Sequence, residues 1–208
     1  MNNIQLEVSN LIGRKYVQGS YIISAVVTQL ASMFESVTDF DLRIRAPLYG
    51  NPVMMITDEP MLPVGTVASG SFTANDKHQH YYLTDTGKPI TSYYEFDEAT
   101  AENSIEAYQD TWILAADKVI DDPFIGWSVI ERSKNLEVFQ HIDPPGSQRK
   151  MWFTGIKFSS LDFLKSPAKF IQSSINHKMV TPNCISRTIS YNGIEVGQRF
   201  AVGKLVNV

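Results

Sequence analysis

Residues 41–72 read DLRIRAPLYGNPVMMITDEPMLPVGTVASGSF, and this segment sets the expected architecture. Short apolar runs alternate with polar residues and stop at proline or glycine, a pattern typical of β-strands joined by turns. The runs are Leu42–Ala46, Pro52–Ile56 and Val64–Phe72, followed by Tyr81–Leu83 and Ile90–Phe96. They predict an antiparallel meander over residues 41–96, with a hairpin turn at 85–89 in which Gly87 takes a positive φ.

Helices are expected on both sides of this meander. Before it, apolar residues recur at helical spacing between Ile22 and Val37, and Ser20 is available as the N-cap. After it, further helices are predicted over residues 98–108 and from residue 167 to 175. These helices would supply apolar faces that cover the sheet.

The rest of the chain adds strands to the prediction. Strand-like runs occur at Trp112–Ala116, Trp127–Arg132, Leu136–Ile142 and Met151–Phe158. A hairpin is predicted at Tyr191-Asn-Gly-Ile, because Asn-Gly favours a two-residue turn. The predicted fold class is therefore α+β, a central and mostly antiparallel sheet with helices packed on it. We expect a single domain over residues 1–208, with residues 166–208 as a C-terminal extension.

Composition narrows the class of protein. Hydrophobic residues make up 43% of the 208 residues and charged residues 19%, which excludes a disordered chain. The single cysteine, Cys184, excludes an internal disulfide and fits a reducing compartment. The first residues do not form a signal peptide, and the apolar stretch Tyr21–Phe34 is too short and too polar to span a bilayer. We therefore expect a cytoplasmic protein with no membrane contact.

Charge is distributed unevenly along the chain. Residues 95–122 hold nine acidic residues and one basic residue, a net charge of −8. Residues 148–208 hold nine basic and two acidic residues, a net charge of +7. Two solvated faces of opposite charge would explain this distribution. The alternative is an acidic surface that steers a basic protein partner toward the chain.

Residue patterns for catalysis or metal binding are weak. His78 and His80 would share one face of a strand, but no third ligand stands nearby, so we expect no metal site and predict an exposed loop or the start of a strand over residues 75–80. Glycine-rich phosphate loops and the G-x-S-x-G motif do not occur. Asp121 and Asp122 could serve a hydrolase, although adjacent residues of an extended segment point opposite ways. We expect no enzyme, and no catalytic, metal-binding or cofactor-binding residue.

Aromatic residues beside bases, as in Lys150-Met-Trp-Phe, could stack on nucleic acid. We expect instead that Trp152 and Phe158 face inward from a strand. A nucleic-acid-binding protein would also carry a more basic overall charge than −4. Nucleic acid is therefore not an expected partner.

Several features occur together between Thr111 and Leu164. They are the strand Trp112-Ile-Leu-Ala-Ala-Asp, the acidic turn Asp121-Asp-Pro-Phe, two strands ending near His141, Trp152, and the closing Phe158-Ser-Ser-Leu-Asp-Phe-Leu. In these features the chain resembles the SMI1/KNR4 (SUKH) superfamily. The resemblance implies a SUKH-like α+β fold and a bacterial immunity protein of a toxin–antitoxin type, which neutralises a cognate toxin by direct binding. It carries over no catalytic residues.

The predicted function is thus that of a binding protein. The expected contact surface for a basic toxin consists of Glu98, Glu102, Asp121 and Asp122. Two alternatives remain open: a structural or assembly protein of a phage or secretion system, and a hydrolase using the carboxylates near 121–122. The sequence does not predict an oligomeric state.

Overall fold

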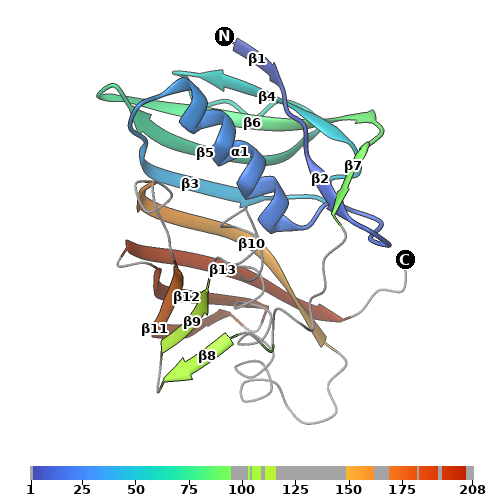
Figure 1. Ribbon diagram of the computed structural model, residues 1–208. Helices are drawn as coiled ribbons and strands as arrows, with labels where there is room; N and C mark the ends of the chain where they lie inside the picture. Colours follow the sequence, from blue (N-terminus) through green and yellow to red (C-terminus); the bar gives the residue numbers. More distant parts are fainter. Residues whose placement is uncertain are drawn as a thin grey trace.

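One large antiparallel sheet dominates the computed structural model of the chain (Figure 1). The structure describes residues 2–94, 103, 105–108, 111–115, 149–161, 169–181, 183–191 and 194–204. Its strands are β1 (Asn2–Gln5), β3 (Thr38–Ile44), β4 (Asn51–Thr57), β5 (Thr66–Ala74), β6 (Lys77–Lys88), β8 (Ile105–Tyr108), β9 (Thr111–Ala115), β10 (Arg149–Ser160), β11 (Lys169–Thr181), β12 (Cys184–Tyr191) and β13 (Ile194–Lys204). These eleven strands lie in the order β1-β4-β6-β5-β3-β10-β13-β12-β11-β9-β8. Two short strands, β2 (Ser9–Leu11) and β7 (Ser92–Tyr94), pair in parallel beside it.

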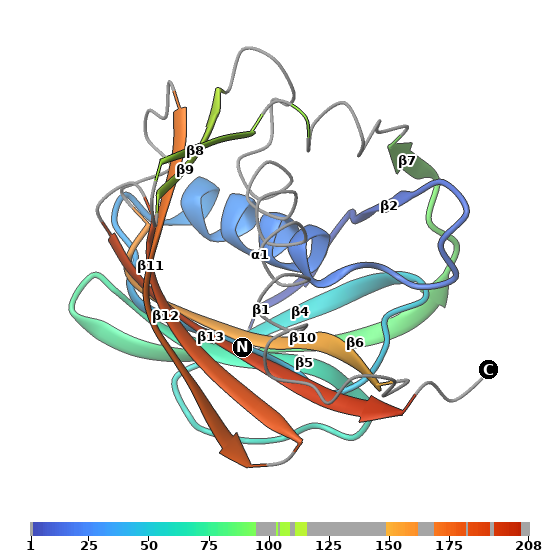
Figure 2. The ribbon, with the colours of Figure 1, turned by 90° about the horizontal axis from the view of Figure 1, so that it is seen from below.

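A single long helix, α1 (Gly19–Met33), covers the concave face of this sheet among the described residues. Figure 2 shows the sheet curving around the helix. The helix buries Ile22, Ile23, Val26, Val27 and Leu30 against core residues of the strands. We call the side of the sheet that α1 covers the inner face and the opposite side the outer face. In the part of the chain that the structure describes, no helix is long and apolar enough to cross a membrane.

The sheet has two halves, which meet where β3 pairs with β10. Arg43 pairs with Gly155, Leu42 with Ile156 and Asp41 with Lys157. From this junction the strands β5, β6, β4 and β1 extend to one side, and β13, β12, β11, β9 and β8 extend to the other. The main core lies under α1 and crosses the junction, and a second cluster of Ile185, Phe200 and Val202 lies in the second half. Phe153 packs against both clusters.

An extra residue in β10 changes which side chains face inward. The pairing with β13 passes from Phe153 opposite Phe200 directly to Gly155 opposite Arg199, so Thr154 is a β-bulge. The Thr154 hydroxyl donates a hydrogen bond to the Arg199 carbonyl at 3.1 Å. Because of the bulge, the alternation of inward-facing and outward-facing side chains is shifted by one residue between Phe153 and Gly155.

Strands occur within residues 41–96 as predicted, but the predicted meander is wrong, because β4 pairs with β6 and not with its neighbours in the chain, β3 and β5. The β5–β6 hairpin turns at Asn75 and Asp76, whose φ angles are 52° and 59°. A two-residue turn with both φ angles positive suits Asn and Asp, which tolerate this conformation. His78 and His80 therefore lie in the first part of β6, which is the strand start and not the exposed loop among the two placements predicted for residues 75–80. Gly87 does take a positive φ of 67°, but it lies near the end of β6.

The α+β class with helices packed on a sheet is wrong, because strands dominate the described residues. The predicted helix before the meander is confirmed, although its N-cap is Gln18 and Ser20 is buried in its first turn. Residues 105–108 and 169–175 were predicted as helical and lie in β8 and β11 instead. Strand β11 pairs with β9 on one side and β12 on the other, and such pairing overrides a weak helical pattern.

Candidate active site

The start of α1 lies directly over the junction of the two halves. A Cβ atom added to Gly19 would lie 2.7 Å from the Phe153 Cδ1 atom and 3.1 Å from the Ile44 Cδ1 atom. Phe153 belongs to β10 and Ile44 to β3, so the helix meets both strands of the junction at this residue. Glycine is needed here because a larger residue would push the helix away from the sheet.

The N-terminus of α1 has no side-chain cap. Gln18 has extended backbone angles, φ −70° and ψ 152°, but its side chain makes no capping hydrogen bond, and the first turn contains no acidic residue. The first N–H groups of a helix and its dipole give this end a partial positive charge. Such an end can stabilise an oxygen that gains negative charge in a reaction.

The segment before α1 is held in place by backbone contacts. The Val17 N–H donates to the Leu48 carbonyl at 2.8 Å. The Asn10 side chain, 4% exposed, donates from Nδ2 to the Arg14 carbonyl at 3.1 Å. This segment places two exposed cations, Arg14 and Lys15, a few residues before the helix start. It can therefore attract an anionic group to that end of the helix.

The described residues at this junction supply electrostatic stabilisation and not a general base. The two side chains that contact the helix start, Phe153 and Ile44, are apolar. Ser20 is buried, at 6% exposed, in the first turn. The arrangement can polarise a carbonyl group and exclude water from its surroundings.

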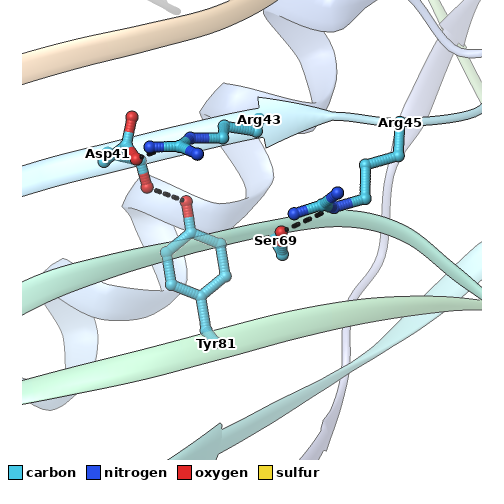
Figure 3. Close-up of polar contacts among 5 residues, drawn as sticks. All are labelled: Asp41, Arg43, Arg45, Ser69 and Tyr81. Carbon is cyan, nitrogen blue, oxygen red and sulfur yellow. Dashed lines mark hydrogen bonds and ion pairs between the residues drawn. The ribbon is translucent and has the colours of Figure 1, made fainter. Parts of the chain in front are cut away.

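A separate polar network lies at β3 and β5 (Figure 3). The Arg43 Nε atom lies 3.1 Å from the Asp41 Oδ2 atom, and the Arg45 Nε atom donates to the Ser69 hydroxyl at 3.0 Å. These side chains extend from the outer face, because Leu42 and Ala68 point to the core between them. The sheet thus separates this network from the start of α1.

Tyr81 is a buried structural donor. Its hydroxyl donates to the Asp41 carbonyl at 2.8 Å, and its ring passes over Gly70, where an added Cβ would collide with the Asp41 carbonyl oxygen and lie 2.5 Å from the Tyr81 hydroxyl. Burial, and secondly the charge of Asp41, raise the pKa of Tyr81 well above its usual value of 10.0. Tyr81 therefore stays protonated at neutral pH and does not act as a base.

His78 and His80 lie close together in β6. Their ring centroids are 5.0 Å apart at an interplanar angle of 87°. Burial, and secondly the charge of His78, lower the pKa of His80 below 6.5. No group of three metal-ligating side chains occurs among the described residues. Within those residues, the pair therefore has no third ligand of the kind that a zinc site uses.

The four acids predicted from sequence to bind a partner all fall outside the described residues. Glu98, Glu102, Asp121 and Asp122 therefore stay a prediction. Cys184, the other reactive side chain considered, is a half-buried free thiol in β12. The uncapped helix start was missed, although the Gly19-Ser20 pair ahead of an apolar helical run is a signal that could have indicated it.

Comparisons with known proteins give matches in structure only. No protein-family model matches the chain, and no curated protein matches it. A protein assigned as a thioesterase II from Thermobifida fusca matches 97% of this chain and 92% of its own, with a TM-score of 0.50 and 9% identity. The dehydratase domain of RzxB from Pseudomonas fluorescens matches 95% and 88%, with a TM-score of 0.49 and 9% identity. A protein of unknown function with a hot dog fold from Alicyclobacillus acidocaldarius matches 99% and 93%, with a TM-score of 0.49 and 9% identity.

At 9% identity these likenesses concern the fold alone. The arrangement of α1 in a curved antiparallel sheet and the likeness to the Thermobifida fusca protein together define the class as that protein's fold, an antiparallel sheet that curves around one long helix.

The comparisons overturn the identification drawn from sequence. The resemblance to the SMI1/KNR4 (SUKH) superfamily is wrong, because the chain shares its fold with the Thermobifida fusca protein and no family model supports SUKH. The immunity function, with its toxin–antitoxin partner, rested on that resemblance and is corrected with it. The assembly alternative and the expectation that the chain is not an enzyme are corrected too, since the structure that matches at a TM-score of 0.50 is that of a protein assigned as a thioesterase.

Proposed function

We propose that this chain hydrolyses an acyl thioester at the start of α1. The observation that carries the proposal is the uncapped N-terminus of α1 over the junction of β3 and β10. The fold that this chain shares with the Thermobifida fusca thioesterase II supports the choice of substrate.

The reaction needs a group that holds an oxyanion. Water bonds to the thioester carbonyl carbon and gives up a proton, and the carbonyl electron pair moves onto oxygen. The oxyanion then re-forms the carbonyl, the carbon–sulfur bond breaks, and the thiol leaves with a proton. N–H groups in the first turn of α1 would donate to the oxyanion, an interaction whose loss typically lowers kcat about 100-fold or more.

Arg14 and Lys15 support a thiol carrier that bears phosphate, such as coenzyme A. Both side chains are exposed shortly before the helix start, where they would attract a phosphate group. A cytoplasmic location also belongs to the proposal, because the lone free thiol of Cys184 suits a reducing compartment.

The test places a carboxylate side chain at the N-terminus of α1. Gln18→Asp adds a carboxylate that can accept hydrogen bonds from the first-turn N–H groups, which should stabilise the fold by about 1 kcal/mol. The same carboxylate would compete with the oxyanion, so kcat/KM for acetyl-, butyryl- and octanoyl-coenzyme A should fall about 100-fold. Thiol release and thermal unfolding are measured on the same samples.

A matched variant controls for charge. Thr28→Glu adds one negative charge to an exposed position of α1 away from its first turn, and it should leave kcat/KM within about two-fold of the wild type. Absence of thiol release from every acyl-coenzyme A, or full activity in a stabilised Gln18→Asp variant, would contradict the proposal.

A further inference from the structure

The outer face of the junction carries a group of exposed cations beside a tryptophan. We call the side chains of Arg43, Arg45, Trp152, Lys157 and Arg199 the outer platform. Arg43 and Arg199 stand on either side of Gly155, since β3 and β13 both pair with β10 at that residue. At about 4.8 Å between strands, their Cα atoms lie about 10 Å apart.

The cations of the outer platform are available for a ligand. All four are exposed. Arg43 forms an ion pair with Asp41. The Asp41 side chain is 13% exposed, whereas that of Arg43 is 52% exposed. No hydrogen bond or ion pair joins the side chains of Lys157 and Arg199 to another residue in the part of the chain that the structure describes. No described carboxylate therefore neutralises these two cations of the outer platform directly.

Two more carboxylates lie at one end of the same face. Asp39 in β3 and Glu195 in β13 are both exposed and stand beyond Lys157 along their strands. The opposite end of the platform holds Arg45 and Trp152. Four cations against the three carboxylates of Asp41, Asp39 and Glu195 give the described side chains of this face a net charge of +1, with its positive part at the end nearer the tryptophan.

Trp152 was predicted to face inward, and this prediction is wrong, because its side chain lies on the outer face. It is 37% exposed, whereas Phe158 is 4% exposed and confirms the inward placement predicted for it. The indole rests on Gly203 of β13, where an added Cβ would lie 3.1 Å from its Cζ3 atom. This support holds the ring in place and leaves part of it open to solvent.

Gly155 keeps the platform flat between its arginines. A Cβ atom at this position would lie 2.9 Å from the Leu42 carbonyl oxygen of β3. Ala201, which pairs with Trp152, and Gly203 are also small. A planar ring can therefore approach the indole while its attached phosphates reach the arginines.

We propose that the outer platform binds single-stranded nucleic acid. Cations that follow a phosphate backbone, combined with an aromatic ring on which a base stacks, are the chemistry that such strands require. The outer face lies on the convex side of the curved sheet, whereas a free nucleotide gains affinity from a concave pocket. A second copy of the chain would bring two positively charged faces together, which opposes its binding here.

The experiment measures fluorescence anisotropy of a labelled twelve-nucleotide oligothymidylate with the full chain at low salt. Binding should weaken with added salt, with a log–log slope of about −3, because each neutralised phosphate contributes about −0.7. Lys157→Gln combined with Arg199→Gln should reduce that slope by about 1.4. Trp152→Ala should weaken binding about 5- to 150-fold at unchanged slope.

Two exposed residues elsewhere provide matched controls. Lys77→Gln removes a cation from the far end of β6, and Tyr49→Ala removes an aromatic side chain that is 60% exposed. Both should bind like the wild type, and all variants should keep the wild-type thermal unfolding midpoint within a few degrees.

Three results would overturn the proposal. The first is absence of binding at about 100 μM protein in low salt, the weak limit for non-specific strands. The second is equal competition by free thymidine monophosphate, which would make the site one for single nucleotides. The third is a wild-type dimer that Trp152→Ala converts to monomer, which would mean that a second copy covers this face. Thioester hydrolysis is measured in parallel on the same samples. A protein that does not hydrolyse thioesters can still bind the oligothymidylate, so the failure of one proposal is distinguished from the failure of the other.

Discussion

The inner and outer faces of the junction differ although neighbouring residues of the same two strands form them. On the inner face Leu42 and Ile156 are 0% and 2% exposed and join the core under α1. On the outer face Arg43 and Lys157 are exposed to solvent. Alternation along a strand therefore allows one pair of strands to support a candidate active site on one side and a charged surface on the other.

The largest effect on the free energy of unfolding should come from adding a side chain at Gly70, on the inner face. Gly70→Ala places a Cβ against the Asp41 carbonyl oxygen and the Tyr81 ring, both held by the core. We expect a loss of about 3 kcal/mol in the free energy of unfolding, measured with urea. Gly197→Ala is the matched change, because its Cβ would lie 3.6 Å from the Lys157 Cβ atom in ordinary contact. A similar loss for both variants would mean that the two faces do not differ in packing.

A smaller effect should follow from truncating the adjacent aromatic residues Phe153 and Trp152. Phe153→Ala removes the ring that joins the two core clusters and contacts Phe200 at a centroid distance of 5.7 Å. It should cost about 2–3 kcal/mol of unfolding free energy. Trp152→Ala, on the outer face, should cost less than about 1 kcal/mol. If Trp152→Ala proves the more destabilising, the assignment of the two faces is wrong.

The smallest effect concerns Tyr81 and pH. Its pKa is raised in the folded protein, so the folded state holds its proton more tightly than the unfolded chain. The stabilisation is fully present below pH 10 and should be lost as pH rises above that value. Tyr81→Phe should cost about 1–2 kcal/mol at pH 7, because the Asp41 carbonyl loses its donor, and should remove this alkaline dependence. Urea unfolding at pH 7 to 11 measures both, and an unchanged alkaline slope in the variant would contradict the assignment.

The strands that sequence predicted correctly are those whose pattern is local. Leu42–Ala46 alternates, Pro52–Ile56 is a short apolar run, and Tyr191 pairs with Ile194 as the Asn-Gly hairpin signal predicted. The helix prediction for residues 167–175 failed because the partners β9 and β12, and not local periodicity, make β11 a strand. Distant pairing of this kind leaves no trace in a single sequence.

The candidate site was missed for a similar reason. It is defined by the close approach of Gly19 to Phe153, two residues far apart in the chain, and by a missing side-chain cap. Sequence analysis searched for charged and ligating side chains, which led to Glu98, Glu102, Asp121 and Asp122. A site built from backbone N–H groups offers no such residues to find.

The bulge at Thr154 fixes the identity of both faces. If Thr154 took a regular place in the ladder, strict alternation from Gly155 backward would place Phe153 outside and Trp152 inside. Deleting this one threonine would instead remove the bulge and leave Phe153 opposite Phe200 and Gly155 opposite Arg199, with the phenyl group inside and the indole outside. The bulge thus accommodates an additional residue without changing which of the two neighbouring aromatic residues meets solvent.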